Sequence, residues 1–292
     1  FRWHPFLREF ALMALEAQPA RAMLLRLTLA EHLAGALREH HLRETRPTSA
    51  GLAWVAREWP HLLDAWRTVA AVRRVDLWEP LSEAVALHAE ITAQYRQGSA
   101  WLELPPEVRS ACGVHAIEPA HVDLLRARLL HWVEGERALE LLAGAEPAFT
   151  RAGDIDGQIA ALRLRGVVQW RRGDAPRAAL TLQTALDLGQ QHGHLRWRAI
   201  LLDGLGLALE AQGSYEAAQA SWLEALSLNH AGGNAHQEVQ NRINLAIGRR
   251  PGDDDGAVAM AERALALAQA IGYEQFVAHA LATVAWARLN TG

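Results

Sequence analysis

The sequence predicts an all-α fold, a right-handed α-solenoid of helix pairs of about 40 residues each behind an irregular helical region. The first observation is composition. Half of the residues are apolar and only 7% are aromatic, and abundant alanine and leucine with few β-branched residues favour helix over strand. The second observation is a period. Glycines recur at steps of 40, 40 and 39 residues, and a residue with almost no side chain stands thirteen positions after each of them. The glycines are Gly153, Gly193, Gly233 and Gly272, and the small residues are Gly166, Gly206, Ala246 and Ala285.

A unit of this length has room for two helices of about four turns each and two short turns. Alanines seven residues apart precede each repeat glycine, as Ala178 and Ala185 do, and this spacing places them on one face of a helix. We expect the second helix of each pair to cross the first closely at Gly166 and its equivalents. We also expect each repeat glycine to form a left-handed helix cap.

The residues that carry the period resemble the tetratricopeptide (TPR) repeat. One unit contains Leu205, Gly206, Gly213, Tyr215, Ala218, Trp222 and Ala225, and Gly166, Gly173, Ala178, Leu182 and Ala185 fit the same frame. The third unit departs from it, because Ala246 replaces the glycine. The period exceeds the common TPR length of about 34 residues and is similar to the longer repeats of bacterial regulators.

We expect residues 1–45 to hold the end of a winged-helix-like module and a long linker helix. The run from Phe1 to Ala11 resembles the end of the winged-helix module in STAND-type signalling ATPases, which include large LuxR- and SARP-type transcriptional regulators. The resemblance implies that His4 faces a bound nucleotide diphosphate. The alternative is a histidine packed at the start of a helix. The ATPase core itself is missing from the chain.

Residues 46–112 are expected to form an irregular helical region with a divergent helix pair, and residues 113–292 the repeat array. Pro105, Pro106, Gly113 and Pro119 mark the boundary between them. The irregular region holds four tryptophans, for which packing of short helices is the commoner use and a ligand cage the alternative. They are Trp54, Trp59, Trp66 and Trp78.

The sequence contains no recognisable catalytic constellation, so we expect a non-catalytic fragment with no cofactor and no metal site. All 29 basic residues are arginine. The absence of lysine excludes a Walker A loop and any Schiff-base mechanism. The nucleophile elbow, the dinucleotide fingerprint and the paired-histidine zinc motif are also absent.

Charge and hydropathy further limit the partners. The net charge of −4 argues against direct nucleic-acid binding, and no run of about 20 apolar residues predicts a membrane span. Cys112 is the single cysteine, which excludes an intrachain disulfide. We expect a cytoplasmic fragment of a longer chain.

The predicted array offers a binding surface, because the first helix of each pair lines a concave groove. Its mixed charges and exposed aromatic residue suit a peptide, a small ligand or the edge of another domain. The alternative is a set of solvated helix faces. The positions expected to face inward are Arg163, Val167, Trp170, Asp203, Leu207, Glu210, Gln240, Ile243, Asn244 and Arg250.

The resemblance to STAND-type regulators implies a sensor module that binds an inducer or partner in this groove and relieves autoinhibition of the ATPase core. The partners are then a protein, a peptide or a small-molecule inducer, together with other domains of the parent chain. The alternative is a constitutive TPR scaffold for protein–protein interaction. Self-association through exposed ends of the array stays open.

Overall fold

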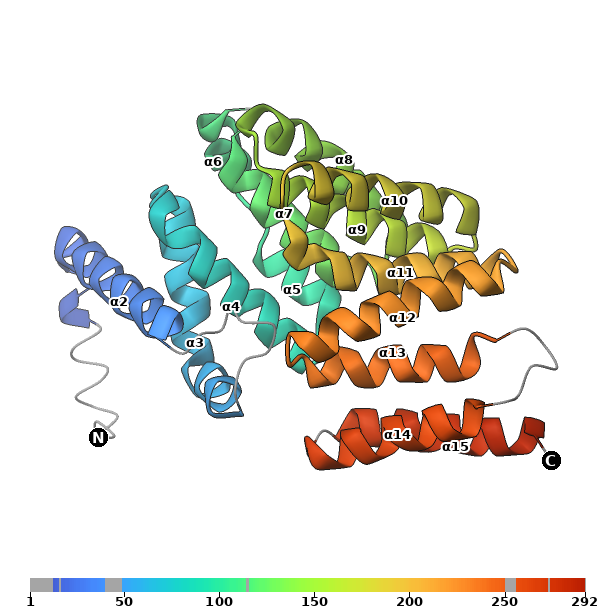
Figure 1. Ribbon diagram of the computed structural model, residues 1–292. Helices are drawn as coiled ribbons and strands as arrows, with labels where there is room; N and C mark the ends of the chain where they lie inside the picture. Colours follow the sequence, from blue (N-terminus) through green and yellow to red (C-terminus); the bar gives the residue numbers. More distant parts are fainter. Residues whose placement is uncertain are drawn as a thin grey trace. The chain divides into compact units, whose positions relative to one another are not determined.

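The computed structural model describes residues 13–15, 17–39, 49–113, 116–249, 256–272 and 274–291. Every regular element in these residues is a helix (Figure 1). The helices pack in sequential pairs, which confirms the predicted all-α, TPR-like fold. The chain forms two compact units, residues 1–148 and residues 149–292. We describe each unit by itself.

Unit 1 has one continuous hydrophobic core, and two of its largest buried side chains are tryptophans. Trp66 and Trp78 are buried, at 1% and 2% exposure. Their indole nitrogens donate to the backbone oxygens of Trp101 (2.9 Å) and Val69 (3.1 Å). These two tryptophans therefore pack the core and line no cage. The helices of unit 1 are α2 (Pro19–Glu39), α3 (Ser49–Ala71), the 3-10 turn η1 (Val75–Leu77), α4 (Trp78–Ile91), α5 (Tyr95–Trp101), α6 (Pro106–Cys112), α7 (Ile117–Leu130) and α8 (Gly135–Ala152), whose last residues belong to unit 2.

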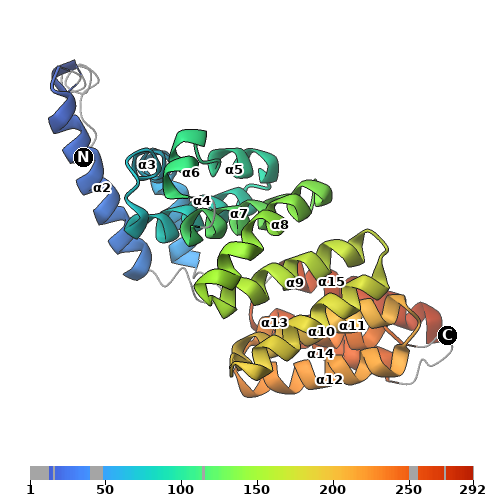
Figure 2. The ribbon, with the colours of Figure 1, turned by 90° about the horizontal axis from the view of Figure 1, so that it is seen from above.

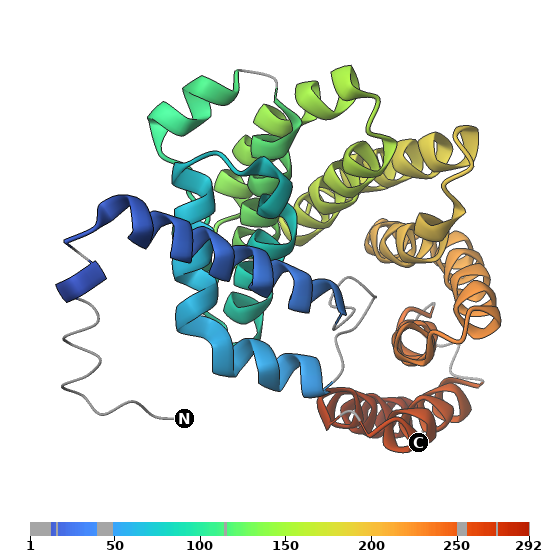
Figure 3. The ribbon, with the colours of Figure 1, turned by 90° about the vertical axis from the view of Figure 1, so that its left-hand side faces the viewer.

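Unit 2 is the regular part of the array. Its helices succeed one another around a curve, from yellow-green to red in Figure 3, and each packs on the next (Figure 2). The first helices of neighbouring pairs also contact each other, α9 with α11, α11 with α13 and α13 with α15. The first helices therefore lie on the inner side of the curve. The helices are α9 (Ile155–Arg171), α10 (Ala175–Gln191), the 3-10 turn η2 (Leu195–Trp197), α11 (Arg198–Ala211), α12 (Tyr215–Ala231), α13 (Ala235–Ile247), α14 (Ala257–Ala270) and α15 (Glu274–Thr291).

The repeat glycines form left-handed turns, and Gly166 and Gly206 lie where two helices cross closely, as the period predicts. The four repeat glycines have φ between 66° and 73°, a left-handed conformation that costs glycine little. A Cβ added to Gly206 would lie 2.3 Å from Nε1 of Trp222, and one on Gly166 would lie 2.6 Å from Cγ of Leu182. Only glycine allows α12 and α10 to approach α11 and α9 this closely.

Capping side chains fix where the first pair of unit 2 begins and turns. Asp154 accepts from the backbone N–H of Gly157 (3.0 Å), and Asp174 accepts from that of Arg177 (3.3 Å). These bonds satisfy N–H groups that lack a partner within the helix. None of the described helices is both long and apolar enough to cross a membrane.

Candidate functional site

A polar network in unit 2, mostly on the inner helices, centres on the half-buried carboxylate of Asp203, which α11 carries. Its Oδ1 accepts a hydrogen bond from Nδ2 of Asn241 (2.7 Å) and another from Nδ2 of Asn244 (2.8 Å), both on α13. Two further amides extend the network. Nδ2 of Asn229 donates to Oδ1 of Asn241 (2.8 Å), and Nε2 of Gln240 donates to Oδ1 of Asn244 (2.9 Å).

The chemistry of the carboxylate sets the direction of every bond in this network. An ionised carboxylate only accepts hydrogen bonds. Asn241 and Asn244 must therefore turn their NH₂ groups toward Asp203, and their carbonyl oxygens are left to accept from Asn229 and Gln240. One charged oxygen thereby orients four carboxamides on two helices.

Burial nevertheless disfavours the charged form of this carboxylate. Burial raises the pKa of Asp203 to about 6, although the bonds from Asn241 and Asn244 and the charge of Arg163 lower it. A charged group taken out of water is stabilised by a nearby opposite charge. A further positive charge or hydrogen-bond donor beside Asp203 would stabilise its charged form.

Helix packing fixes the backbone beneath the carboxylate. Nε1 of Trp222, on α12, donates to the backbone oxygen of Asp203 (3.1 Å). Trp222 is 1% exposed, and its ring covers the backbone at Gly206 and Gly248, where an added Cβ would come within 2.3 Å of it. Two glycines and one tryptophan thus hold α11, α12 and the end of α13 in one arrangement.

The structure brings four of the predicted groove residues together, namely Arg163, Asp203, Gln240 and Asn244. The predicted apolar positions Val167 and Leu207 are half-buried, as are Trp170 and Glu210. Trp170 packs against the cluster around Leu182 and Leu205.

Ile243 was wrongly predicted to face the groove. It is fully buried against Ala264, Ala268 and Ala280 of α14 and α15, and it cannot touch a ligand. Two other predicted residues, His4 and Arg250, lie outside the described residues.

Sequence reasoning missed Asn241 and Asn229, which are 0% and 5% exposed. The 40-residue period could have revealed Asn241. Asn241 occupies the position of Ala161 and Leu201 in the preceding units. A carboxamide where the repeat places an apolar core residue indicates a buried hydrogen-bond partner.

A second polar cluster, at the start of α9, joins neighbouring pairs. Asp156 accepts from Nδ1 of His194 (2.8 Å), Nε1 of Trp197 (2.7 Å) and the guanidinium of Arg196 (2.6 Å). Burial raises the pKa of this carboxyl, but the three donors outweigh it and lower the pKa overall.

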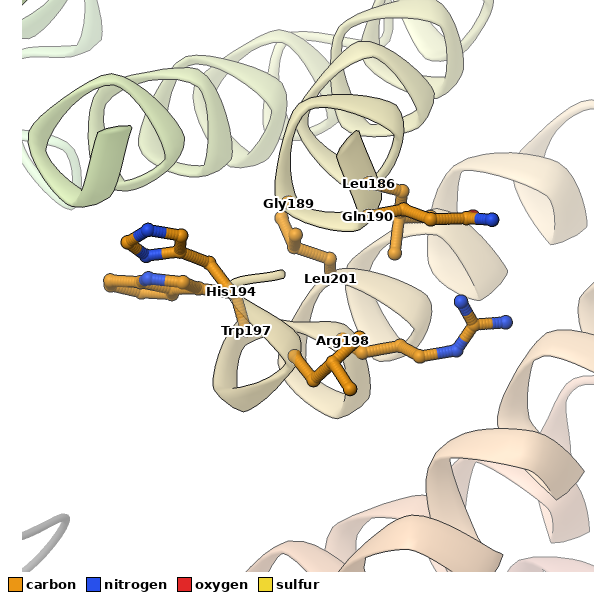
Figure 4. Close-up of a pocket in the computed structure, with 8 residues that line it drawn as sticks. Leu186, Gly189, Gln190, His194, Trp197, Arg198 and Leu201 are labelled. Carbon is orange, nitrogen blue, oxygen red and sulfur yellow. The ribbon is translucent and has the colours of Figure 1, made fainter. Parts of the chain in front are cut away.

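The cavity beside this cluster is shown in Figure 4. Its lining includes Leu186, Gly189 and Leu201, and its volume is about 10 Å³. That is room for a single water at most. The Asp156 cluster therefore acts as a clamp between helix pairs and not as a ligand site. Within the described residues, no group of three or more His, Cys, Asp or Glu side chains could hold a metal ion.

No family model and no curated protein matches the sequence. The comparison with solved structures agrees with the fold. A solved structure of a Rap protein complexed with Competence and Sporulation Factor is similar, with a TM-score of 0.62 and 13% sequence identity. The match covers 91% of this chain and 85% of that one. At this identity the likeness shows a TPR-like helical-repeat fold.

Proposed function

We propose that the inner face of unit 2 is a non-catalytic binding site for an extended peptide, either a free peptide or a segment of a protein. The observation that carries the proposal is the Asp203 network. It assembles the half-buried carboxylate of Asp203, its two buried asparagine partners and the half-buried Gln240 along the inner helices α11 and α13.

Carboxamides suit the backbone of a peptide because each offers two N–H donors and a carbonyl acceptor. In this network one N–H of the Gln240 side chain donates to Asn244. Its second N–H and its carbonyl can pair with one peptide group, which likewise has one donor and one acceptor. This is recognition of a main chain, and it is independent of the ligand's side chains.

Charge and apolar area supply the specificity. Burial disfavours the charged form of the Asp203 carboxylate and raises its pKa, despite the charge of Arg163. We expect it to select an arginine, a lysine or an amino terminus in the ligand. Val167 and Leu207 are half-buried, and Ile247 is 38% exposed. These three residues occupy the same repeat position on α9, α11 and α13 and offer a row for apolar ligand side chains.

The similar Rap protein, which was solved as a complex with Competence and Sporulation Factor, supports the choice of a binding module. Within a STAND-type regulator, as the resemblance of the first residues implies, the ligand would act as an inducer. It would bind the active arrangement of the parent protein more tightly than the autoinhibited one and shift the population toward it.

The alternative is a constitutive scaffold that holds a protein partner without an inducer. Thermal unfolding separates the two. A sensor is stabilised by its ligand in proportion to the logarithm of ligand concentration over Kd, so short peptides must raise the Tm. A scaffold that requires a folded partner surface shows no such shift with peptides.

The test begins with selection of binders from a random peptide library on the 292-residue chain. We expect enrichment of peptides with one basic residue among apolar ones, and loss of at least tenfold in affinity with Asp203→Asn or Gln240→Ala, measured by calorimetry. Gln183→Ala is the control, since Gln183 bonds Asp187 on α10 (2.8 Å), away from the network. Absence of enrichment, or binders indifferent to Asp203→Asn, would overturn the proposal.

A further inference from the structure

Unit 1 contains a cavity of about 280 Å³, which residues of α6, α7 and α8 line (labelled in Figure 1). Small-molecule sites in proteins have volumes of about 300–1,000 Å³. This cavity lies just below that range and has room for a compact organic molecule. The cavity beside Asp156, by contrast, has a volume of only about 10 Å³.

Most of the buried lining of this cavity is small and apolar. Pro119 and Ala120, in the first turn of α7, are buried, and Ala148 of α8 is 3% exposed. Gly144 of α8 also lines the cavity, and a Cβ added to it would have no atom within 4 Å. Side chains of this size leave the space between the helices open. An apolar group of a ligand can lie against them.

Arg109 of α6 brings hydrogen-bond donors to the cavity. Its Nη1 donates to Oδ2 of Asp123 (2.7 Å), and its Nη2 donates to Oδ1 of the same carboxylate (2.8 Å). A guanidinium has five N–H groups in a planar fork. The remaining ones on Arg109 have no acceptor among the residues that the structure describes. They include Nε–H and one Nη2–H, which together match the two oxygens of a carboxylate.

The charges around Asp123 favour an anionic ligand over a cationic one. Nη1 of Arg126 also lies near Oδ1 of Asp123 (3.4 Å), so one buried carboxylate faces two guanidiniums. Arg126 pairs in addition with Glu103 (3.2 Å), but the Glu103 side chain is 60% exposed and is screened by water. The buried part of the cluster therefore has an excess of positive charge. Arg109, whose side chain is 39% exposed, carries that charge at the cavity.

We propose that this cavity binds a small organic molecule with one carboxylate group and a compact apolar body. The carboxylate pairs with the Nε edge of Arg109 and accepts from the hydroxyl of Ser110, which also lines the cavity. The apolar body lies against the buried alanines and proline. This site is in unit 1, whereas the Asp203 network is in unit 2 and suits a ligand of the opposite charge.

The first test is ligand-observed NMR of the 292-residue chain with benzoate, phenylacetate and hexanoate. Each acid is paired with its uncharged amide, which has nearly the same shape. We expect millimolar or tighter binding of at least one carboxylate. Its amide should bind roughly tenfold more weakly or less, because it offers the guanidinium one oxygen and no charge. If no carboxylate binds, or each binds only as tightly as its amide, the proposal is wrong.

Arg109→Lys tests the role of the planar fork. The lysine keeps a positive charge beside Asp123 but is a point charge that cannot bind a carboxylate through two parallel bonds. We expect it to weaken carboxylate binding roughly tenfold or more. Arg57→Lys is the control, because Arg57 pairs with Glu58 on α3 (2.9 Å) and its side chain is 70% exposed. This variant should bind the carboxylate as the original chain does.

Gly144→Leu tests the cavity without touching the ion pair. The new side chain occupies the open space and should abolish binding, while leucine favours the helix more than glycine does. Gly35→Leu is the matched control, because Gly35 also lies in a helix, α2, with no atom within 4 Å of an added Cβ. Circular dichroism must show that each variant is folded. Undiminished carboxylate binding to folded Arg109→Lys or Gly144→Leu would place the ligand elsewhere and overturn the proposal.

Discussion

The indole nitrogen of Trp222 donates a hydrogen bond to the backbone carbonyl oxygen of Asp203, at 3.1 Å. Trp222 stands at a bulky position of the TPR-like frame, and Asp203 carries the carboxylate of the candidate site. One side chain therefore serves two purposes. It fills the crossing between α11 and α12, and it holds the turn of α11 that presents the carboxylate to Asn241 and Asn244. Trp222 therefore couples helix packing to the geometry of the candidate site.

Alanine in place of Gly206 should be strongly destabilising. The new Cβ would lie 2.3 Å from Nε1 of Trp222, so the helices must separate or the hydrogen bond to Asp203 must break. We expect a loss of about 2 kcal/mol or more in the free energy of unfolding, measured with urea. Gly204→Ala is the matched control on the same helix. Its Cβ would lie 3.5 Å from Leu182, an ordinary contact, so it should stabilise by up to about 1 kcal/mol through helix propensity. Equal effects at the two glycines would contradict this account.

Asp203→Asn should stabilise the fold near pH 7.5. In the folded chain the pKa of Asp203 is raised from 3.8 to about 6, so the folded state holds its proton more tightly than the unfolded state. The free energy of unfolding then falls as pH rises through this interval, by roughly 3 kcal/mol once the pH exceeds 6. Asparagine has no charge to bury and avoids this cost.

The measurement is the difference in urea unfolding between Asp203→Asn and the original chain at pH 7.5 and at pH 4. We expect a gain for the variant at pH 7.5 that shrinks greatly at pH 4, together with lost peptide affinity. A gain that is the same at both pH values would show that its origin is not the buried charge.

Asp156→Ala should loosen the contact between neighbouring helix pairs. The substitution leaves the indole N–H of Trp197 and the ring of His194 without their acceptor, which we expect to cost about 2 kcal/mol. Asp187→Ala is a suitable control, because Asp187 bonds only an exposed glutamine on its own helix. Hydrogen exchange should show faster opening around residues 194–197 in the first variant alone. Unchanged exchange there would contradict the clamp.

Ala93→Gly should stabilise unit 1. Ala93 has a φ of 54°, where an L-residue is strained by roughly 1 kcal/mol and glycine is not. The turns of unit 2 place glycine at such positions. Ala266→Gly, on the exposed face of α14, should instead lose about 1 kcal/mol. Thermal unfolding that ranks the two variants in the opposite order would contradict this reasoning.

The sequence alone predicted the helix crossings and turns that recur in every repeat. It did not predict contacts that occur in one repeat only. The crossing at Gly206 and the turn at Gly193 followed from the period, because the same packing problem recurs in each unit. Asp203, Gln240 and Asn244 were predicted to face the groove from their inward positions on the first helices, and the structure joins them by hydrogen bonds.

Ile243 shows the limit of that reasoning. It stands 40 residues after Asp203, and the period predicts the same inward orientation for both. In the structure α14 and α15 cover Ile243, and the amides of Asn241 and Asn244 on either side of it reach Asp203 instead. A single sequence does not reveal this, because the orientation depends on how the next pair packs.

The position of the Asp203 network has a consequence for cooperativity. A helical array is stabilised by contacts between neighbouring helices, so a group of adjacent helices can open locally while the others stay folded. Asn241 and Asn244 lie on α13, and opening of α13 with α14 and α15 would remove both amides from Asp203. A ligand that bridges α11 and α13 must therefore slow the local opening of α13, α14 and α15. Ligand affinity and the order of these three helices are then coupled, so a mutation that weakens one must also weaken the other.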